Sequence, residues 1–174
     1  MTSISPPSKV GNLLRLVLLR VPELVLGALV AILVAFMTVS VFARYVVNVG
    51  IAWSDEASEL LFIWIVFVGF AVGVKHRAHV SVQLLVDRFS PKWRYATEIF
   101  QDAMVLAFSL VFTKESYVTV QFSFLQRFTG LEVSMAWLYS ATLVAGVMMT
   151  IYAAMNLWET IRGKRTRSIE LDND

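Results

Sequence analysis

Long stretches without a charged residue constrain this chain more than any other feature of its sequence. Residues 24–43 form one such stretch of twenty residues, and residues 133–158 form another of twenty-six. A helix needs about twenty apolar residues to cross the hydrocarbon core of a bilayer. The charged fraction is 16%, below the roughly 25% that is typical of soluble domains. The sequence therefore predicts an all-α integral membrane protein.

Two further crossings are predicted between these stretches. Residues 60–74 are uncharged, and a helix that contains them and runs from Asp55 to Lys75 has twenty-one residues. Residues 103–113 are the uncharged core of a weaker candidate. Four transmembrane helices are expected, at about residues 22–46, 55–75, 91–124 and 133–158, within a single membrane domain of residues 1–174. The third would be roughly 50 Å long, so it must tilt strongly or project from a core of about 30 Å.

The basic residues lie mostly on one side of these predicted helices. Twelve of the fifteen Lys and Arg fall before residue 21, at residues 75–94 where the second helix ends and the third begins, or after residue 158. By the positive-inside rule both termini are cytoplasmic, with residues 1–20 as an N-terminal segment and residues 159–174 as a tail. Because the bases follow topology and form no face with interleaved aromatic residues, no nucleic-acid partner is expected.

A short amphipathic helix is predicted at about residues 81–89, between the second and third transmembrane helices. Its apolar positions follow the i, i+3, i+4, i+7 pattern, at Val82, Leu85, Val86 and Phe89. Polar residues occupy the positions between them. Such a helix lies in the membrane interface with its apolar face in the lipid, rather than crossing the bilayer.

The chain carries few side chains that could perform chemistry. It has no cysteine, and its only histidines are His76 and His79, at the expected membrane surface and without a cluster of acids nearby. Haem held between helices would need histidines deep in two spans. No nucleophile–base pair is visible in the sequence. No catalytic residue, cofactor or metal site is therefore expected.

An autonomous transport pathway is not expected either. A protein that moves a solute by itself usually has a charged or broken helix near mid-membrane. The charges of the third helix instead fall toward its ends, at Glu98, Asp102, Lys114 and Glu115. Glu98 and Asp102 share a face with Arg94, which is most simply a solvated helix end and alternatively a partner contact.

Small residues recur on one face of three predicted helices and indicate close helix contact. These faces are Gly69-x-x-x-Gly73 in the second helix, Gly27, Ala31 and Ala35 in the first, and Thr142, Gly146 and Thr150 in the fourth. They could pack inside the four-helix bundle or against a larger partner, and the sequence leaves both readings open.

Arg44 stands near the outer end of the first helix, while Asp55 and Glu56 open the second. The arginine could extend alone to the membrane interface. Alternatively it could pair with one of the acids and tie the two helices together where the turn joins them. Tyr45 and Trp53 lie at interface depth beside it, which suggests partial shielding of such a pair.

Several short motifs follow one another between residues 42 and 87. They are F-x-R-Y-x-x-N at Phe42, Arg44, Tyr45 and Asn48; W-S-D-E at residues 53–56; Phe62, Trp64 and Gly69; K-x-R-x-H-V at residues 75–80; and Asp87. In this order and spacing they resemble the small membrane subunit of tripartite ATP-independent periplasmic (TRAP) transporters, the DctQ-like family. The family usually has Glu where Asp55 stands, a departure that keeps the charge. The remaining helices agree with the family in number and length only.

The resemblance implies a fixed scaffold rather than a solute carrier. Such subunits associate with a large, multi-spanning subunit that carries the substrate and sodium ions, and a soluble periplasmic binding protein delivers the substrate, typically a carboxylate. The chain is thus expected to anchor a sodium-gradient-driven organic-acid uptake transporter in the lipid of the bacterial cytoplasmic membrane. The structural or interface candidates are Arg44, Trp53, Asp55, Glu56, Gly69, Gly73, Arg77, His79 and Asp87.

Two other functions stay open at this point. A self-sufficient small oligomeric transporter or channel should move solute without any partner. A membrane redox-enzyme subunit should bind haem, quinone or metal. Solute uptake by the chain alone and a visible absorption spectrum of the purified protein distinguish these functions from the scaffold.

Overall fold

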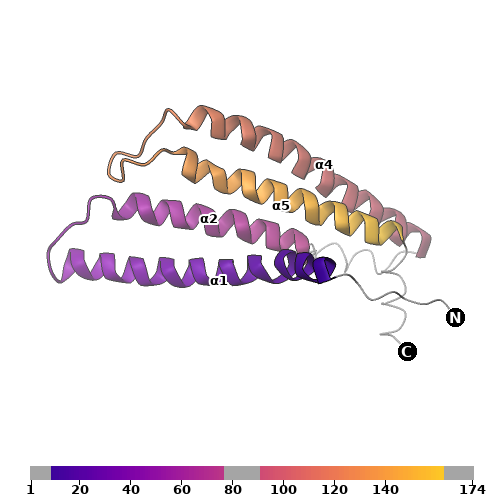
Figure 1. The fold of residues 1–174 in the computed structure, drawn as a ribbon, viewed down its shortest axis with the longest axis horizontal. Coiled ribbons are helices and arrows are strands. Elements are labelled where there is room, and N and C mark those ends of the chain that lie inside the picture. Colours follow the sequence, from indigo (N-terminus) through magenta and orange to yellow (C-terminus); the bar gives the residue numbers. More distant parts are fainter. Residues whose placement is uncertain (1–8, 77–90, 163–174) are drawn as a thin grey trace. The chain divides into compact units, whose positions relative to one another are not determined.

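Four long helices make up the computed structural model, which describes residues 9–76 and 91–162. They are α1 (Lys9–Tyr45), α2 (Ser54–Lys75), α4 (Pro91–Ser123) and α5 (Ala136–Ile161), as Figure 1 shows. Each contains a segment long and apolar enough to cross a membrane. Within those residues the only β-type pairing is one isolated bridge. The predicted fold class, all-α with four spanning helices, is confirmed.

Helix α1 begins earlier than the sequence predicts. It starts at Lys9 and continues through Pro22, although its span-forming part is Arg20–Tyr45. The proline removes one backbone donor from the helix, but the helix is continuous on both sides of it. The predicted interfacial helix at residues 81–89 lies outside the described residues. That helix and the cytoplasmic orientation of both termini stay predictions.

The chain divides into two compact units after Ile65, within α2. The first unit contains α1, the first half of α2 and the connection between them. Asn48 in this connection has φ 58°, a left-handed conformation that asparagine adopts more readily than most residues. The Val49 amide then donates to the Ala43 carbonyl at 3.0 Å. The left-handed residue and this hydrogen bond end α1 and turn the chain toward α2.

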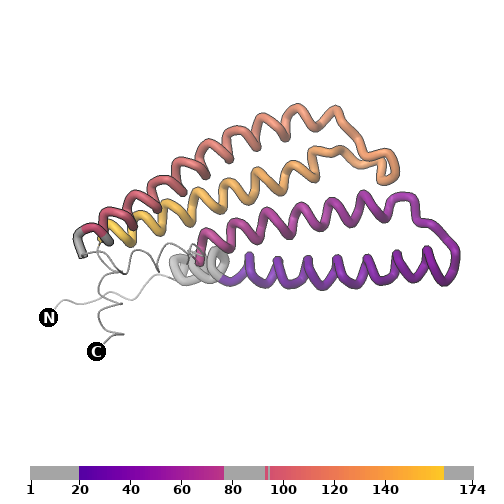
Figure 2. Tube along the Cα trace, turned by 180° about the vertical axis from the view of Figure 1, so that it is seen from behind, coloured from indigo at the N-terminus to yellow at the C-terminus, as the bar shows by residue number. Residues whose placement is uncertain are grey.

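Helices α4 and α5 form the second unit together with the second half of α2. They run antiparallel and side by side in both Figure 1 and Figure 2. The buried face of α4 carries a small or polar residue every seven positions, at Asp102, Ser109, Ser116 and Ser123. A seven-residue repeat keeps one seam of a helix against its neighbour. On α5 the buried alanines are Ala136, Ala141, Ala145 and Ala153, so the two backbones can approach closely.

The hydroxyl groups of this seam have hydrogen-bond partners nearby. Ser109 Oγ donates to the Leu106 carbonyl at 2.9 Å. Thr113 Oγ1 lies 2.7 Å from the Ser109 carbonyl oxygen and 3.2 Å from Thr150 Oγ1. A buried hydroxyl without a partner would cost about 1–3 kcal/mol. Because the Ser109 and Thr113 hydroxyls are paired locally, these two residues act as small spacers in an apolar environment.

The connection between α4 and α5 is a tight hairpin. The Phe128 amide donates to the Val133 carbonyl, and the Met135 amide donates to the Gln126 carbonyl, both at 2.9 Å. The Phe128 side chain is buried beneath the turn. These bonds hold α4 and α5 in a defined register at this end of the pair.

Candidate functional site

The candidate site of the first unit is an ion pair between the end of α1 and the start of α2. Arg44 Nη2 lies 3.1 Å from Asp55 Oδ1 and 3.3 Å from Asp55 Oδ2. Of the two acids considered from the sequence, Asp55 makes this contact, and Glu56 follows it in the first turn of α2. Both acids stand at the positive end of the helix dipole, which favours carboxylates there.

Trp53 supports this end of the unit. Its indole stacks on Phe36 of α1, with ring centroids 5.7 Å apart and an interplanar angle of 28°. The neighbouring Ser54 is buried, and its hydroxyl donates to the Ile51 carbonyl at 2.8 Å. The stacked rings and this short turn fix where Asp55 emerges, so Arg44 can reach it.

The Arg44–Asp55 pair is nevertheless open to its surroundings. The two side chains are 46% and 80% exposed, so Tyr45, Trp53 and the other described residues do not provide the expected shielding. Both contacts also use a single amino nitrogen, not the two-pronged guanidinium geometry that distinguishes arginine from lysine. An exposed pair of this kind stabilises a fold by only about 0–1 kcal/mol.

Arg44→Ala is therefore expected to lower the free energy of unfolding of the purified chain by less than about 1 kcal/mol. Arg44→Lys should behave like the unsubstituted protein, because one nitrogen makes both contacts. Thermal unfolding of the chain in detergent micelles measures both. A loss above about 3 kcal/mol for Arg44→Ala, the range of a desolvated pair, would show that Arg44 and Asp55 are shielded after all.

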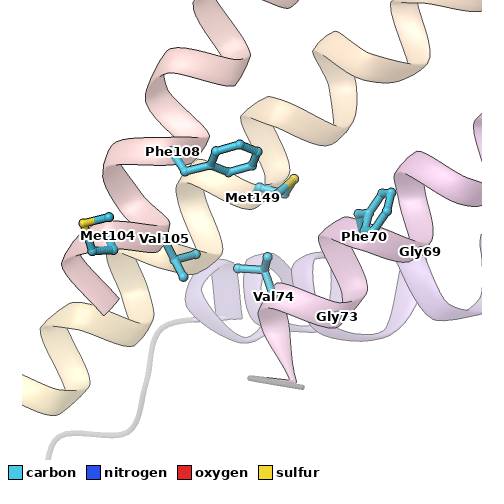
Figure 3. Close-up of a pocket in the computed structure, with 8 residues that line it drawn as sticks. All are labelled: Gly69, Phe70, Gly73, Val74, Met104, Val105, Phe108 and Met149. Carbon is cyan, nitrogen blue, oxygen red and sulfur yellow. The ribbon is translucent and has the colours of Figure 1, made fainter. Parts of the chain in front are cut away.

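Gly69 and Gly73 of α2, predicted as a packing face, border an apolar groove in the second unit. The groove has a volume of about 530 Å³, and six apolar side chains complete its lining. Figure 3 shows Phe108 of α4 and Met149 of α5 reaching toward this space opposite α2. A Cβ added to Gly73 would meet no other heavy atom of the described structure within 4 Å. Gly73 is therefore not at a tight helix crossing.

Two contacts hold the second half of α2 against the α4–α5 pair. Phe67 stacks on Phe112 of α4, with centroids 5.9 Å apart. Asn156 Nδ2 of α5 donates to the Val74 carbonyl at 2.9 Å. The carbonyl belongs to the last turn of α2, where helix carbonyls lack intrahelical partners. Asn156 therefore acts as a side-chain cap for a neighbouring helix.

A buried carboxylate links α4 to α5, where the sequence favoured a solvated helix end. Asp102 is 7% exposed and Thr160 is 1% exposed. Thr160 Oγ1 donates to Asp102 Oδ2 at 2.6 Å. The signal that could have identified Asp102 is its spacing of seven residues from Ser109 and of fourteen from Ser116. That repeat places all three on one seam, which the four-residue spacing to Glu98 obscured.

Three of the predicted site residues, Arg77, His79 and Asp87, lie outside the described residues. The structure brings Arg44, Trp53 and Asp55 together in the first unit and places Gly69 and Gly73 along one groove in the second. Among residues 9–76 and 91–162, no group of three or more His, Cys, Asp or Glu side chains could hold a metal ion.

A family model described as tripartite ATP-independent periplasmic transporters, DctQ component, matches residues 33–163. The matched range takes in the Arg44–Asp55 pair, the groove of the second unit and the whole α4–α5 hairpin. The chain belongs to the DctQ family. Proteins of this family are components of TRAP transporters. With four candidate spans, the chain is a multi-pass protein of the bacterial inner membrane.

Several curated TRAP transporter proteins are similar to this chain. The sialic acid TRAP transporter small permease protein SiaQ of Vibrio cholerae is 26% identical over 138 residues, which cover 79% of this chain and 80% of SiaQ. The C4-dicarboxylate TRAP transporter small permease protein DctQ of the same organism is 33% identical over 87 residues, 48% of this chain and 38% of that protein. The sialic acid TRAP transporter permease protein SiaT of Haemophilus influenzae is 23% identical over 123 residues, 71% of this chain and 20% of SiaT.

Proposed function

We propose that this chain is the small permease subunit of a TRAP transporter and anchors a large permease subunit in the membrane. The match to the DctQ component over residues 33–163 carries the proposal. The similarity to SiaT supports it further, because a segment like this chain makes up only 20% of that permease. In SiaT, a segment similar to this chain belongs to a much longer permease polypeptide.

The substrate class follows from the relatives by analogy. SiaQ is named for sialic acid and DctQ for C4-dicarboxylates, and both substrates are organic acids that carry a carboxylate. We extend this class to the transporter that contains the present chain. A periplasmic binding protein would deliver the anion, and a sodium gradient would drive its uptake through the large subunit. The Arg44–Asp55 pair, exposed at one end of two spanning helices, suits contact with one of these proteins.

Uptake into proteoliposomes tests this function. Vesicles that contain this chain alone should accumulate no labelled organic acid, with or without an inward sodium gradient. Vesicles that contain the chain, the large subunit and the binding protein should accumulate it only when sodium is higher outside. The large subunit without this chain should show reduced uptake, because its anchor is missing.

Three results would contradict the proposal. Gradient-driven uptake by this chain alone would identify it as a self-sufficient transporter. Failure of the chain to co-purify with any large permease subunit from the membrane would remove the anchor role. A visible absorption band of the purified chain would instead indicate bound haem and a redox function.

A further inference from the structure

The outer face of α4 carries an ion pair that the rest of the fold does not explain. Lys114 Nζ lies 3.5 Å from Glu115 Oε1, and the two side chains are 78% and 62% exposed. Ser116, the next residue, is buried against α5. Because successive residues are rotated by about 100° around a helix, Lys114 points away from the α5 seam.

The position of this pair along the helix differs from the sequence-based expectation. The fourth span is uncharged over residues 133–158, and Trp137 and Trp158 stand near its two ends, both exposed. Tryptophan is enriched at the two membrane interfaces. The two residues are twenty-one positions apart, or about 32 Å along a helix, close to the thickness of the hydrocarbon core.

The α4–α5 register then gives the depth of Lys114 and Glu115. Thr113 Oγ1 lies 3.2 Å from Thr150 Oγ1, and a Cβ on Gly146 would lie 3.1 Å from Thr113 Cα. Thr113 is thus level with the midpoint between the two tryptophans. Lys114 and Glu115 follow it by only about 1.5–3 Å of helix rise. Measured against the two tryptophans of α5, Lys114 and Glu115 lie closer to the middle of the span than their sequence position suggested.

Lipid cannot satisfy an ion pair at this depth. Charged residues within spanning segments almost always face protein or a water-filled cavity, because hydrocarbon offers no hydrogen bonds. An ammonium has three donors, and a carboxylate has about four acceptor sites. The contact between Lys114 and Glu115 uses at most one of these donors and one of these acceptor sites. The remaining donors and acceptor sites are available to a partner.

Apolar side chains surround the pair on the same surface. Val111, Val118 and Phe122 are 62%, 37% and 73% exposed, and they lie three or four residues from Lys114 or from one another, which places them on one side of α4. We call Val111, Lys114, Glu115, Val118 and Phe122 the docking face. It combines an apolar stripe with one polar pair, as in helix interfaces within membranes.

We propose that the docking face binds a transmembrane helix of the large permease subunit that presents a hydrogen-bond acceptor to Lys114 and a donor to Glu115 at mid-membrane. This inference rests on the proposed function and adds to it the surface of contact and its chemistry. A charged pair opposite complementary polar groups fixes the depth and rotation of the two helices, because a shift of one turn would leave buried charges unpaired.

Two sets of variants of the co-expressed two-subunit complex test the docking face. Lys114→Leu and Glu115→Leu, singly and together, should each lower the yield of large subunit that co-purifies with this chain by about tenfold or more, as expected when a buried charge loses its partners. Val147→Leu is the matched control. It lies at the same depth on α5, is 44% exposed, and should leave the yield unchanged.

Thermal unfolding of each isolated chain separates lost docking from misfolding. The double Lys114→Leu/Glu115→Leu chain should unfold at the same temperature as the unsubstituted chain, or higher, because it exposes no charge to lipid. Co-purification of that double variant at full yield would overturn the docking face while leaving the anchor function intact. If no large subunit co-purifies with the unsubstituted chain, the proposed anchor function itself is contradicted.

Cross-linking identifies the occupant directly. A photoreactive amino acid at Val118 should attach this chain to the large subunit within native membranes. Attachment to a second copy of this chain, or to lipid alone, would overturn the inference. Attachment to a second copy would show a homodimer contact, and attachment to lipid alone would show that the docking face is open to the bilayer.

Discussion

Replacing Gly146 with leucine should separate α4 from α5 and produce one of the largest losses of stability in this chain. Even one added carbon has no space: a Cβ at this position would lie 2.8 Å from Thr113 Oγ1, 3.1 Å from Thr113 Cα and 3.2 Å from Phe112 Cδ1. The threonine hydroxyl can rotate away, but its Cα belongs to the backbone of α4. The helix axes must therefore move apart, which breaks the Thr113–Thr150 contact.

Overpacking a well-packed contact costs about 1–3 kcal/mol, which we expect for Gly146→Ala, and Gly146→Leu should reach or exceed the upper limit. Thermal unfolding of the purified chain in micelles measures both. Gly73→Ala is the matched control, because no atom of the described structure lies within 4 Å of its added Cβ. It should be neutral or slightly stabilising, since alanine favours a helix over glycine by about 0.5–1 kcal/mol. Equal losses at the two glycines would show that the α4–α5 crossing is not tight at Gly146.

Asp102→Ala is expected to have a comparable effect at the other end of the same helix pair. The substitution removes the nearer acceptor of the buried Thr160 hydroxyl, which donates to Asp102 Oδ2 at 2.6 Å and lies 3.0 Å from the Asn156 carbonyl oxygen. It also leaves an empty volume between α4 and α5. The combined loss should be about 1–3 kcal/mol, from the small cavity and from the exchange of a short hydrogen bond for the longer one to the Asn156 carbonyl.

A double-mutant cycle shows whether Asp102 and Thr160 act together. Thr160→Val keeps the shape of threonine but removes its donor, and should cost about 1–3 kcal/mol. Combined with Asp102→Ala it should cost clearly less than the sum of the two, because either substitution alone already breaks the contact. Thr119→Val at an exposed position of α4 is the control, with an expected change within about 0.5 kcal/mol. Strict additivity would mean that Asp102 and Thr160 stabilise the fold independently.

The fold class was accessible from the sequence because a bilayer limits what a chain can do within it. Backbone groups in hydrocarbon must be paired internally, so an uncharged run such as residues 133–158 predicts a helix with little regard to its partners. The start of α1 was less accessible. Residues 9–21 carry bases between apolar positions, and neither membrane length nor composition distinguishes a separate surface segment from the continuous helix that forms.

The Arg44–Asp55 pair shows what the spacing of residues in the sequence can predict and what it cannot. A short connection joins α1 to α2, so the sequence could place an arginine at one end near an acid at the other. It could not show that the pair is exposed or that one nitrogen makes both contacts. Exposure depends on what surrounds the turn, and hydrogen-bond geometry depends on side-chain rotamers.

By itself, the sequence determined that this protein crosses the membrane with helices and belongs with TRAP small permease subunits, because hydrophobic length and short motifs are local properties of a chain. Only the tertiary structure decided which side chains face one another. The register of α4 on α5 buries Asp102 beside Thr160 and makes Gly146 rather than Gly73 the close crossing. The same register sets Thr113, the neighbour of Lys114, beside Gly146 and Thr150 near the middle of α5. The level of a residue on α4 relative to α5 depends on how the two helices pack, which the sequence alone does not specify.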